Sequence, residues 1–99
     1  EQGALREALR GPVDAWHSKH KSNLRGLLSS IHTVLWADSG WVPVGVADLL
    51  DDKQVRKVWM RANLLVHPDK VRQRGGSAEQ LALSGLIFDV LKKAWEARQ

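Results

Sequence analysis

The chain has 99 residues, which suits one compact domain whose single core leaves little room for a deep catalytic cleft. Its 15 Lys and Arg against 11 Asp and Glu give a net charge of +4, so an acidic protein, a nucleic acid or a membrane face would suit it as partner. Cysteine is absent, which excludes disulfide bridges and thiolate chemistry and suits the reducing cytoplasm, where we expect this protein.

Membrane insertion is not expected from the sequence. No apolar run approaches the ~18 residues that a membrane-spanning helix needs. Residues 1–10 also lack the basic-then-apolar order of a signal peptide. We therefore expect a soluble domain, which can be part of a longer protein.

Three helices are predicted in the first part of the chain. Residues 4–10 favour a short helix that Gly11 ends, and Pro12 suits the first position of a second helix running to about His20. Ser22 then suits the N-cap of an amphipathic helix that reaches about Trp36. This third helix is the first long one, and its apolar residues follow the i, i+3, i+4, i+7 period, at Leu24, Leu27, Leu28, Ile31, Val34 and Leu35.

Residues 37–48 lose the helical period and carry turn residues, which predicts an ordered loop anchored by Trp41. Asp51 and Gln54 then form a capping box for a second long helix, which Pro68 ends at about Val66 or His67. The buried face of this helix is predicted at Val55, Val58, Trp59, Ala62, Leu65 and Val66.

A polar connection through Gly75 and Gly76 leads to the last long helix. Ser77 and Gln80 form its capping box. Its apolar stripe comprises Leu83, Leu86, Ile87, Val90, Leu91, Ala94 and Trp95. Alternating apolar runs of strand length are missing, so we predict an all-α domain whose second and third long helices are antiparallel.

The second long helix presents cations opposite its apolar stripe. A helical wheel places Lys53, Arg56, Lys57, Met60 and Arg61 on one arc. Most charge runs merely solvate a helix, but here no Asp or Glu lies between Lys53 and Val66, so the like charges repel one another without compensation. An acidic partner would relieve that repulsion.

His67-Pro68-Asp69-Lys70 follows this helix directly, and Pro68 is expected to project its neighbours from a turn. Taken alone, the tripeptide indicates only a helix end at which His67 interacts with the last carbonyls. The order of a basic helix, His-Pro-Asp, a polar loop and a long amphipathic helix, however, resembles the J-domain family.

The resemblance narrows to the auxilin branch, including the plant auxilin-like proteins. The residues that carry it are Asn23–Ser30, Val34–Trp36, Gly40–Val44, Ala47–Leu49, Val55–Val58, Ala62, Leu65–Lys70, Ile87–Asp89 and Ala94–Trp95. It implies a helical hairpin joined by a His-Pro-Asp loop, with a J-domain at residues 22–99 and a helical extension at residues 1–21. Met60 stands where the family often has a further cation.

The resemblance also implies a function without catalysis by this chain, cofactor or metal. A monomeric co-chaperone would stimulate ATP hydrolysis by a DnaK-type heat-shock chaperone. The docking residues would be His67, Pro68, Asp69, Lys70, Lys53, Arg56, Lys57 and Arg61. In auxilins the client is assembled clathrin, so clathrin-coat disassembly is implied, with clathrin-binding segments outside this chain.

Two other classes of function stay open at this point. A nucleic-acid-binding helix needs only phosphate neutralisation by the cations, although no base-stacking aromatic surface is evident. A metal or hydrolytic enzyme would have to use His17 with His20, or His67 with Asp69, and such pairs are common by chance.

Overall fold

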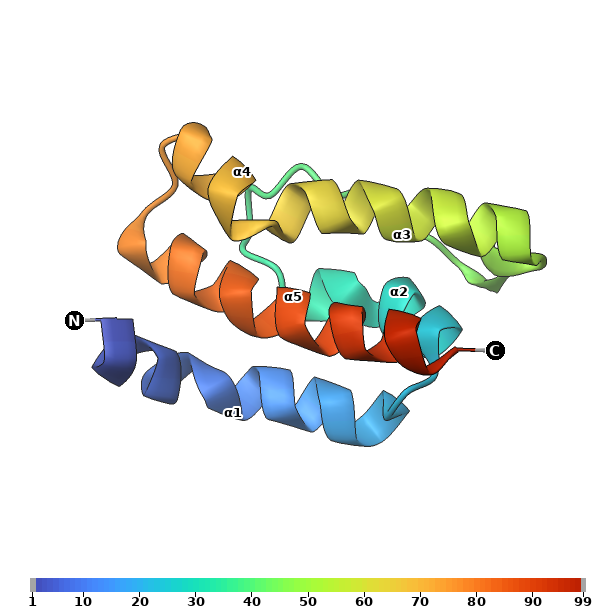
Figure 1. The fold of residues 1–99 in the computed structure, drawn as a ribbon, viewed down its shortest axis with the longest axis horizontal. Coiled ribbons are helices and arrows are strands. Elements are labelled where there is room, and N and C mark those ends of the chain that lie inside the picture. Colours follow the sequence, from blue (N-terminus) through green and yellow to red (C-terminus); the bar gives the residue numbers. More distant parts are fainter. Residues whose placement is uncertain (1, 99) are drawn as a thin grey trace.

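The computed structural model describes residues 2–98, and this part of the chain is helical without a strand. The elements are α1 (Gln2–His20), α2 (Leu24–Ser30), η1 (Ile31–Thr33), η2 (Val46–Leu49), α3 (Asp52–Val66), α4 (Pro68–Gln73) and α5 (Ala78–Ala97). Helices α3 and α5 run antiparallel (Figure 1). The predicted all-α class and the predicted hairpin are confirmed.

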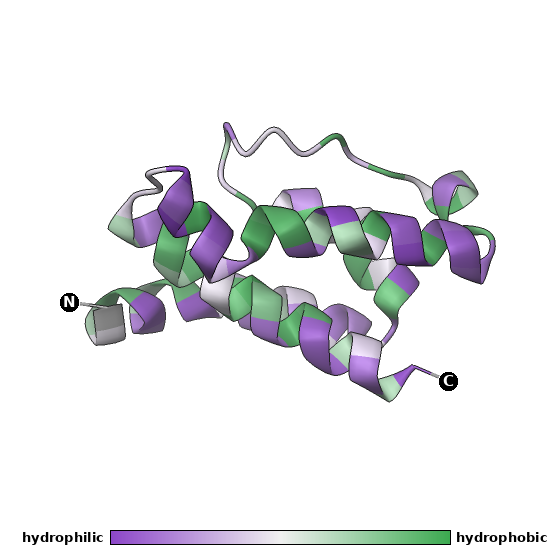
Figure 2. Ribbon diagram, turned by 45° about the horizontal axis from the view of Figure 1, so that its top comes forward, coloured by the Kyte–Doolittle hydropathy of each residue, from purple (hydrophilic) through white to green (hydrophobic). Residues whose placement is uncertain are grey.

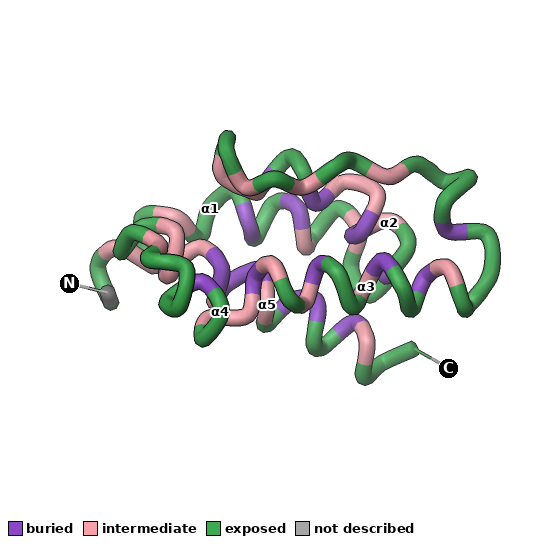
Figure 3. The backbone as a smooth tube through the Cα atoms, turned by 90° about the horizontal axis from the view of Figure 1, so that it is seen from above, coloured by how far each residue is buried: buried purple, intermediate pink, exposed green. Residues whose placement is uncertain are grey.

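Helix α5 lies at the centre of the molecule and contacts each of the other α-helices. Helices α1 and α3 lie on either side of it (Figure 1). Apolar and polar residues alternate around the helices (Figure 2), and the buried positions recur along their length (Figure 3). The fully buried large side chains of the core are Val13, Leu27, Leu28, Ile31, Leu49, Val66, Val71, Ile87 and Leu91.

Both predicted capping boxes are confirmed. The Gln54 backbone N–H donates to Oδ1 of Asp51 over 2.8 Å, and the Gln80 N–H donates to Oγ of Ser77 over 3.0 Å. Helix α3 ends at Val66, as Pro68 requires. Capping therefore fixes the starts of the two hairpin helices from local sequence alone.

The predicted division of the N-terminal segment at Gly11 is wrong, because α1 is one continuous helix with Pro12 inside it. Proline withholds an N–H from the helical ladder, a defect that costs ~3 kcal/mol in an isolated helix. Here Val13 is 1% exposed and Trp16 is 5% exposed, and Leu9 packs against the same core. Burial of this apolar stripe compensates for the defect.

Helix α1 is attached to the rest of the domain by polar contacts as well. Trp16 Nε1 donates to Oγ of Ser30 over 2.9 Å, and Arg6 pairs with Asp89 of α5 at 3.6 Å. Oγ of Ser30 also lies 3.0 Å from Nε2 of His20. A boundary between an extension at residues 1–21 and a J-domain at residues 22–99 stays a prediction.

Helix α2 differs from its prediction at both ends. Asn23, rather than Ser22, is the N-cap, and its Oδ1 accepts from the Gly26 N–H over 3.2 Å. The helix ends at Ser30 instead of about Trp36. The Thr33 hydroxyl donates to the Ser30 carbonyl over 2.7 Å, and the Val34 N–H donates to the Ile31 carbonyl instead. Side-chain hydroxyls thus compete with the helical ladder.

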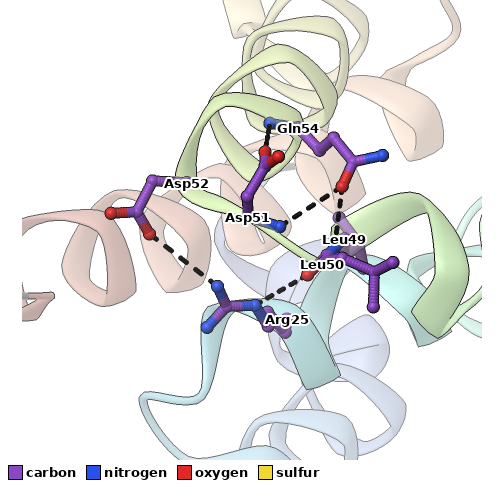
Figure 4. A network of polar contacts seen from close by, with 6 residues as sticks. All are labelled: Arg25, Leu49, Leu50, Asp51, Asp52 and Gln54. Atoms are coloured by element: carbon purple, nitrogen blue, oxygen red, sulfur yellow. Dashed lines mark hydrogen bonds and ion pairs between the residues drawn. The ribbon is translucent and has the colours of Figure 1, made fainter.

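The predicted loop contains η2, which local periodicity did not indicate. Arg25 of α2 ties the end of η2 to the start of α3, since its Nε donates to the Leu49 carbonyl over 2.8 Å and its Nη2 lies 3.7 Å from Oδ1 of Asp52 (Figure 4). Oε1 of Gln54 accepts from the Leu50 and Asp51 N–H groups. Before η2, Trp41 is half-buried and packs against the core, as predicted.

Replacing Trp41 by Ala should lower the free energy of unfolding by about 2 kcal/mol, less than for a fully buried Trp because the side chain is only partly buried. Urea unfolding followed by circular dichroism measures this. Val42→Ala is the matched control, since Val42 is 68% exposed and its truncation should change the free energy by less than ~0.5 kcal/mol. Equal stability of the Trp41→Ala variant and the wild type would assign Trp41 to a binding surface instead.

Candidate functional site

Helix α3 separates an apolar side from a basic side, as the helical wheel predicts. Its buried side chains are Val55, Val58, Ala62 and Val66. The four predicted cations of this helix are all exposed, namely Lys53, Arg56, Lys57 and Arg61. We call these four residues, together with Met60 and Leu64, the basic face of α3.

The cations of the basic face are not neutralised by any carboxylate of the described residues. Within residues 2–98, none of the four makes an ion pair. Two of them contact aromatic rings instead, with the Arg56 Cζ 5.9 Å from the Trp95 ring centroid and the Arg61 Cζ 5.5 Å from that of Trp41. These contacts bring no opposite charge to the two guanidinium groups, so the face presents a positive potential to a partner.

Two large apolar side chains interrupt the basic face. Met60 is 54% exposed and Leu64 is 55% exposed, and their i, i+4 spacing places them side by side on the helix. The helical wheel predicts Met60 on this arc, whereas Leu64 was not among the predicted residues. Its apolar character at a position four residues after Met60, on the side opposite the buried stripe, is the signal that identifies it.

His67 forms the corner between α3 and α4. Its backbone N–H donates to the Asn63 carbonyl over 2.9 Å and so closes α3, and its Nδ1 accepts from the Asp69 N–H over 3.2 Å and so caps α4. Pro68 is the first residue of α4. The expectation of a plain turn here is wrong, since proline is well suited to the first position of a helix and starts one immediately.

Asp69 and Lys70, the next two predicted residues of the corner, differ in their contacts. Asp69 pairs with Arg72 at 3.2 Å within α4, an exposed contact. Lys70 is exposed and forms no ion pair within the described part of the chain. The His67 ring meets the edge of the Phe88 ring at 5.1 Å and 62°, which fixes the imidazole against α5.

Helix α4 is held in place by contacts that the sequence did not reveal. Val71 is 2% exposed, and Nη2 of Arg74 donates to the Leu65 carbonyl near the end of α3 over 2.6 Å. The Gly76 N–H donates to Val71 and the Gly75 N–H to Arg72, a Schellman motif in which Gly75 has φ +77°. No sequence signal distinguishes Arg74 from the other cations of the polar connection.

Residues 2–98 hold no candidate metal cluster and no candidate membrane span. Among residues 2–98, no group of three His, Cys, Asp or Glu side chains could hold a metal ion. His20, one of the two early histidines, contacts Ser30 instead. None of the described helices is long and apolar enough to cross a bilayer.

The chain is similar to proteins named for J-domains and auxilins, although no family model matches it. It is 44% identical over 95 residues, 96% of this chain, to auxilin-like protein 1 of Arabidopsis thaliana. It is 42% identical over 84 residues, 85% of this chain, to a J domain-containing protein required for chloroplast accumulation response of the same plant. It is 29% identical over 94 residues, 94% of this chain, to an auxilin-like clathrin uncoating factor of Saccharomyces cerevisiae.

The match covers only a small part of each relative. The chain spans 7% of the first, 13% of the second and 14% of the third. The matched region nonetheless takes in nearly all of this chain, and the helices agree with the hairpin and the His-Pro-Asp corner that the resemblance implies. The chain belongs to the J-domain family, in its auxilin-like branch.

Proposed function

We propose that this co-chaperone domain stimulates ATP hydrolysis by a DnaK-type heat-shock chaperone and does not itself catalyse a reaction. The observation that carries the proposal is the uncompensated basic face of α3, which ends directly at the His67 corner. Long-range attraction by these cations would steer the encounter and orient the chaperone. The His67 corner would then couple docking to hydrolysis.

The residues proposed to dock on the chaperone divide by chemistry. Lys53, Arg56, Lys57, Arg61 and Lys70 supply positive charge. Met60 and Leu64 supply apolar area that a partner can desolvate, which strengthens the surrounding polar contacts. Pro68 and Asp69 start α4 and, with His67, present a rigid corner, because Val71 and Arg74 hold α4 against the core and α3.

Single-turnover ATP hydrolysis by a cytosolic DnaK-type chaperone, with this domain added, tests the proposal. We expect the wild type to accelerate hydrolysis and His67→Gln to lose at least about nine-tenths of the acceleration, equivalent to ~1.4 kcal/mol in the barrier. His32→Gln is the matched control, because His32 is exposed on η1, outside the basic face and the corner. Circular dichroism checks that all three proteins are equally helical.

Two results would contradict the proposal. Equal acceleration by wild type and His67→Gln would remove the corner from the mechanism. Failure of the wild type to accelerate hydrolysis, combined with tight binding to mixed-sequence DNA and a steep salt dependence, would favour the nucleic-acid-binding alternative.

We further propose that the parent protein uses this activity to disassemble clathrin coats in the cytoplasm. The yeast relative named a clathrin uncoating factor supports this client, and the clathrin-binding segments would lie outside the 99 residues. The domain itself would act as a monomer, since α5 is covered by α1, α2, α3 and α4 of the same chain and needs no second copy.

Coat disassembly in vitro tests the clathrin proposal separately from the proposed stimulation of the chaperone. The isolated domain should stimulate the chaperone but release little clathrin, whereas a fusion to a clathrin-binding segment should release it. Tethering raises the effective concentration of the domain at the coat, which explains the expected gain of at least about tenfold. A fusion that stimulates hydrolysis normally but fails to release clathrin would indicate another client.

A further inference from the structure

A second candidate surface lies toward the opposite end of α3 from the His67 corner and shares Arg56 with the basic face. A hollow of about 300 Å³ opens there between the start of α2, the start of α3 and the end of α5. The apolar side chains of Leu24, Val55 and Trp95 contribute to its lining, together with the three arginines Arg25, Arg56 and Arg98. Its lining residues Asp52 and Arg56 lie 15 and 11 residues before His67, or roughly 22 and 16 Å along the helix at 1.5 Å per residue.

Trp95 is the centre of this arrangement. The Arg98 Cζ lies 3.5 Å from the Trp95 ring centroid, and the Arg56 Cζ lies 5.9 Å from it. Trp59 stacks on Trp95 with centroids 4.0 Å apart at 14°, so the ring is supported from within the hairpin. A guanidinium that stacks by its face keeps its edge N–H groups available to acceptors.

The positive charge of the hollow exceeds its negative charge. Asp52 is the one carboxylate among the described residues of the lining, and it lies 3.7 Å from Arg25. Arg25 also donates to the Leu49 carbonyl and is thus committed to the fold (Figure 4). Among the described residues, Arg56 and Arg98 have no carboxylate within ion-pair distance.

We propose that this hollow binds an acidic peptide segment of a partner protein. Arg56 and Arg98 would receive its carboxylates, for which the planar guanidinium offers paired donors. The apolar floor formed by Leu24, Val55 and Trp95 would accept a neighbouring apolar side chain of the segment. Trp and Arg are the residue types most enriched where peptides and proteins bind strongly. This inference does not rest on the proposed function.

The lining favours a peptide over a phosphate-rich ligand. An apolar side chain of a peptide can cover the apolar part of the lining, whereas a sugar-phosphate backbone has no such group to place there. The arginines are exposed and the hollow is partly open to solvent, which suits an extended segment lying across it. Spaced carboxylates beside an apolar side chain therefore match the site best.

Fluorescence anisotropy of a labelled peptide of alternating Glu and Leu, titrated with the whole chain, tests the proposal. We expect saturable binding that Arg98→Gln weakens about fivefold, the effect of losing one exposed ion pair. Lys92→Gln removes the same charge from an exposed position of α5 outside the lining, and it should weaken binding less than about twofold. The Trp95 indole N–H resonance should shift on peptide addition.

Several outcomes would overturn the proposal. Equal weakening by Arg98→Gln and Lys92→Gln would show that the peptide is attracted by the overall positive charge and not bound in the hollow. Absence of peptide binding would remove the site, and so would an Arg98-dependent binding of single-stranded DNA in its place. Because Arg98 lies outside the surface proposed for the chaperone, Arg98→Gln should leave ATPase stimulation unchanged, so failure here is distinguishable from failure of the proposed function.

Discussion

Packing against α5 is the interaction on which the rest of the structure depends. Ile87 and Leu91 of this helix are fully buried, and α5 contacts α1, α2, α3 and α4. A chain of this size has one core, so each helix must turn its apolar stripe toward it. Helix α3 turns Val55, Val58, Ala62 and Val66 inward and leaves its cations exposed. The basic face is thus a consequence of how the core is built.

The same packing makes the corner at His67 rigid. Pro68 ends α3 and starts α4, so two helices meet with a single residue between them. That junction would be free to swing if α4 were only a solvent-exposed turn. Burial of Val71, the bond from Arg74 to the Leu65 carbonyl and the contact of His67 with Phe88 fix it in one arrangement. A preorganised corner loses little conformational entropy on binding.

Local sequence predicted the features that local chemistry determines. The capping boxes at Asp51 and Ser77 and the end of α3 before Pro68 depend on neighbours within a few residues, and they are confirmed. The continuity of α1 through Pro12 depends on burial against α5, which no local pattern reveals. The early end of α2 depends on competition from hydroxyl groups, which propensity does not weigh.

The residues of the candidate site also fall into those that local sequence predicts and those that only tertiary contacts reveal. The exposed cations of α3 follow from helical periodicity, and the sequence places them correctly. Leu64 was missed although its spacing of four residues from Met60 places it on the same arc, and Arg74 was missed because its acceptor is nine residues away. Tertiary contacts therefore supply what the motif leaves open, namely how the corner is held and which apolar groups lie among the cations.

The most direct test of the account is to map the surface that the chaperone covers. Amide resonances of the ¹⁵N-labelled domain would be followed as an ATP-bound DnaK-type chaperone is added. The account predicts broadening or shifts at Lys57, Arg61, Leu64 and Lys70, with Asp14 on α1 unaffected. Changes confined to α1 or to the surroundings of Arg98, with the basic face of α3 unchanged, would contradict it.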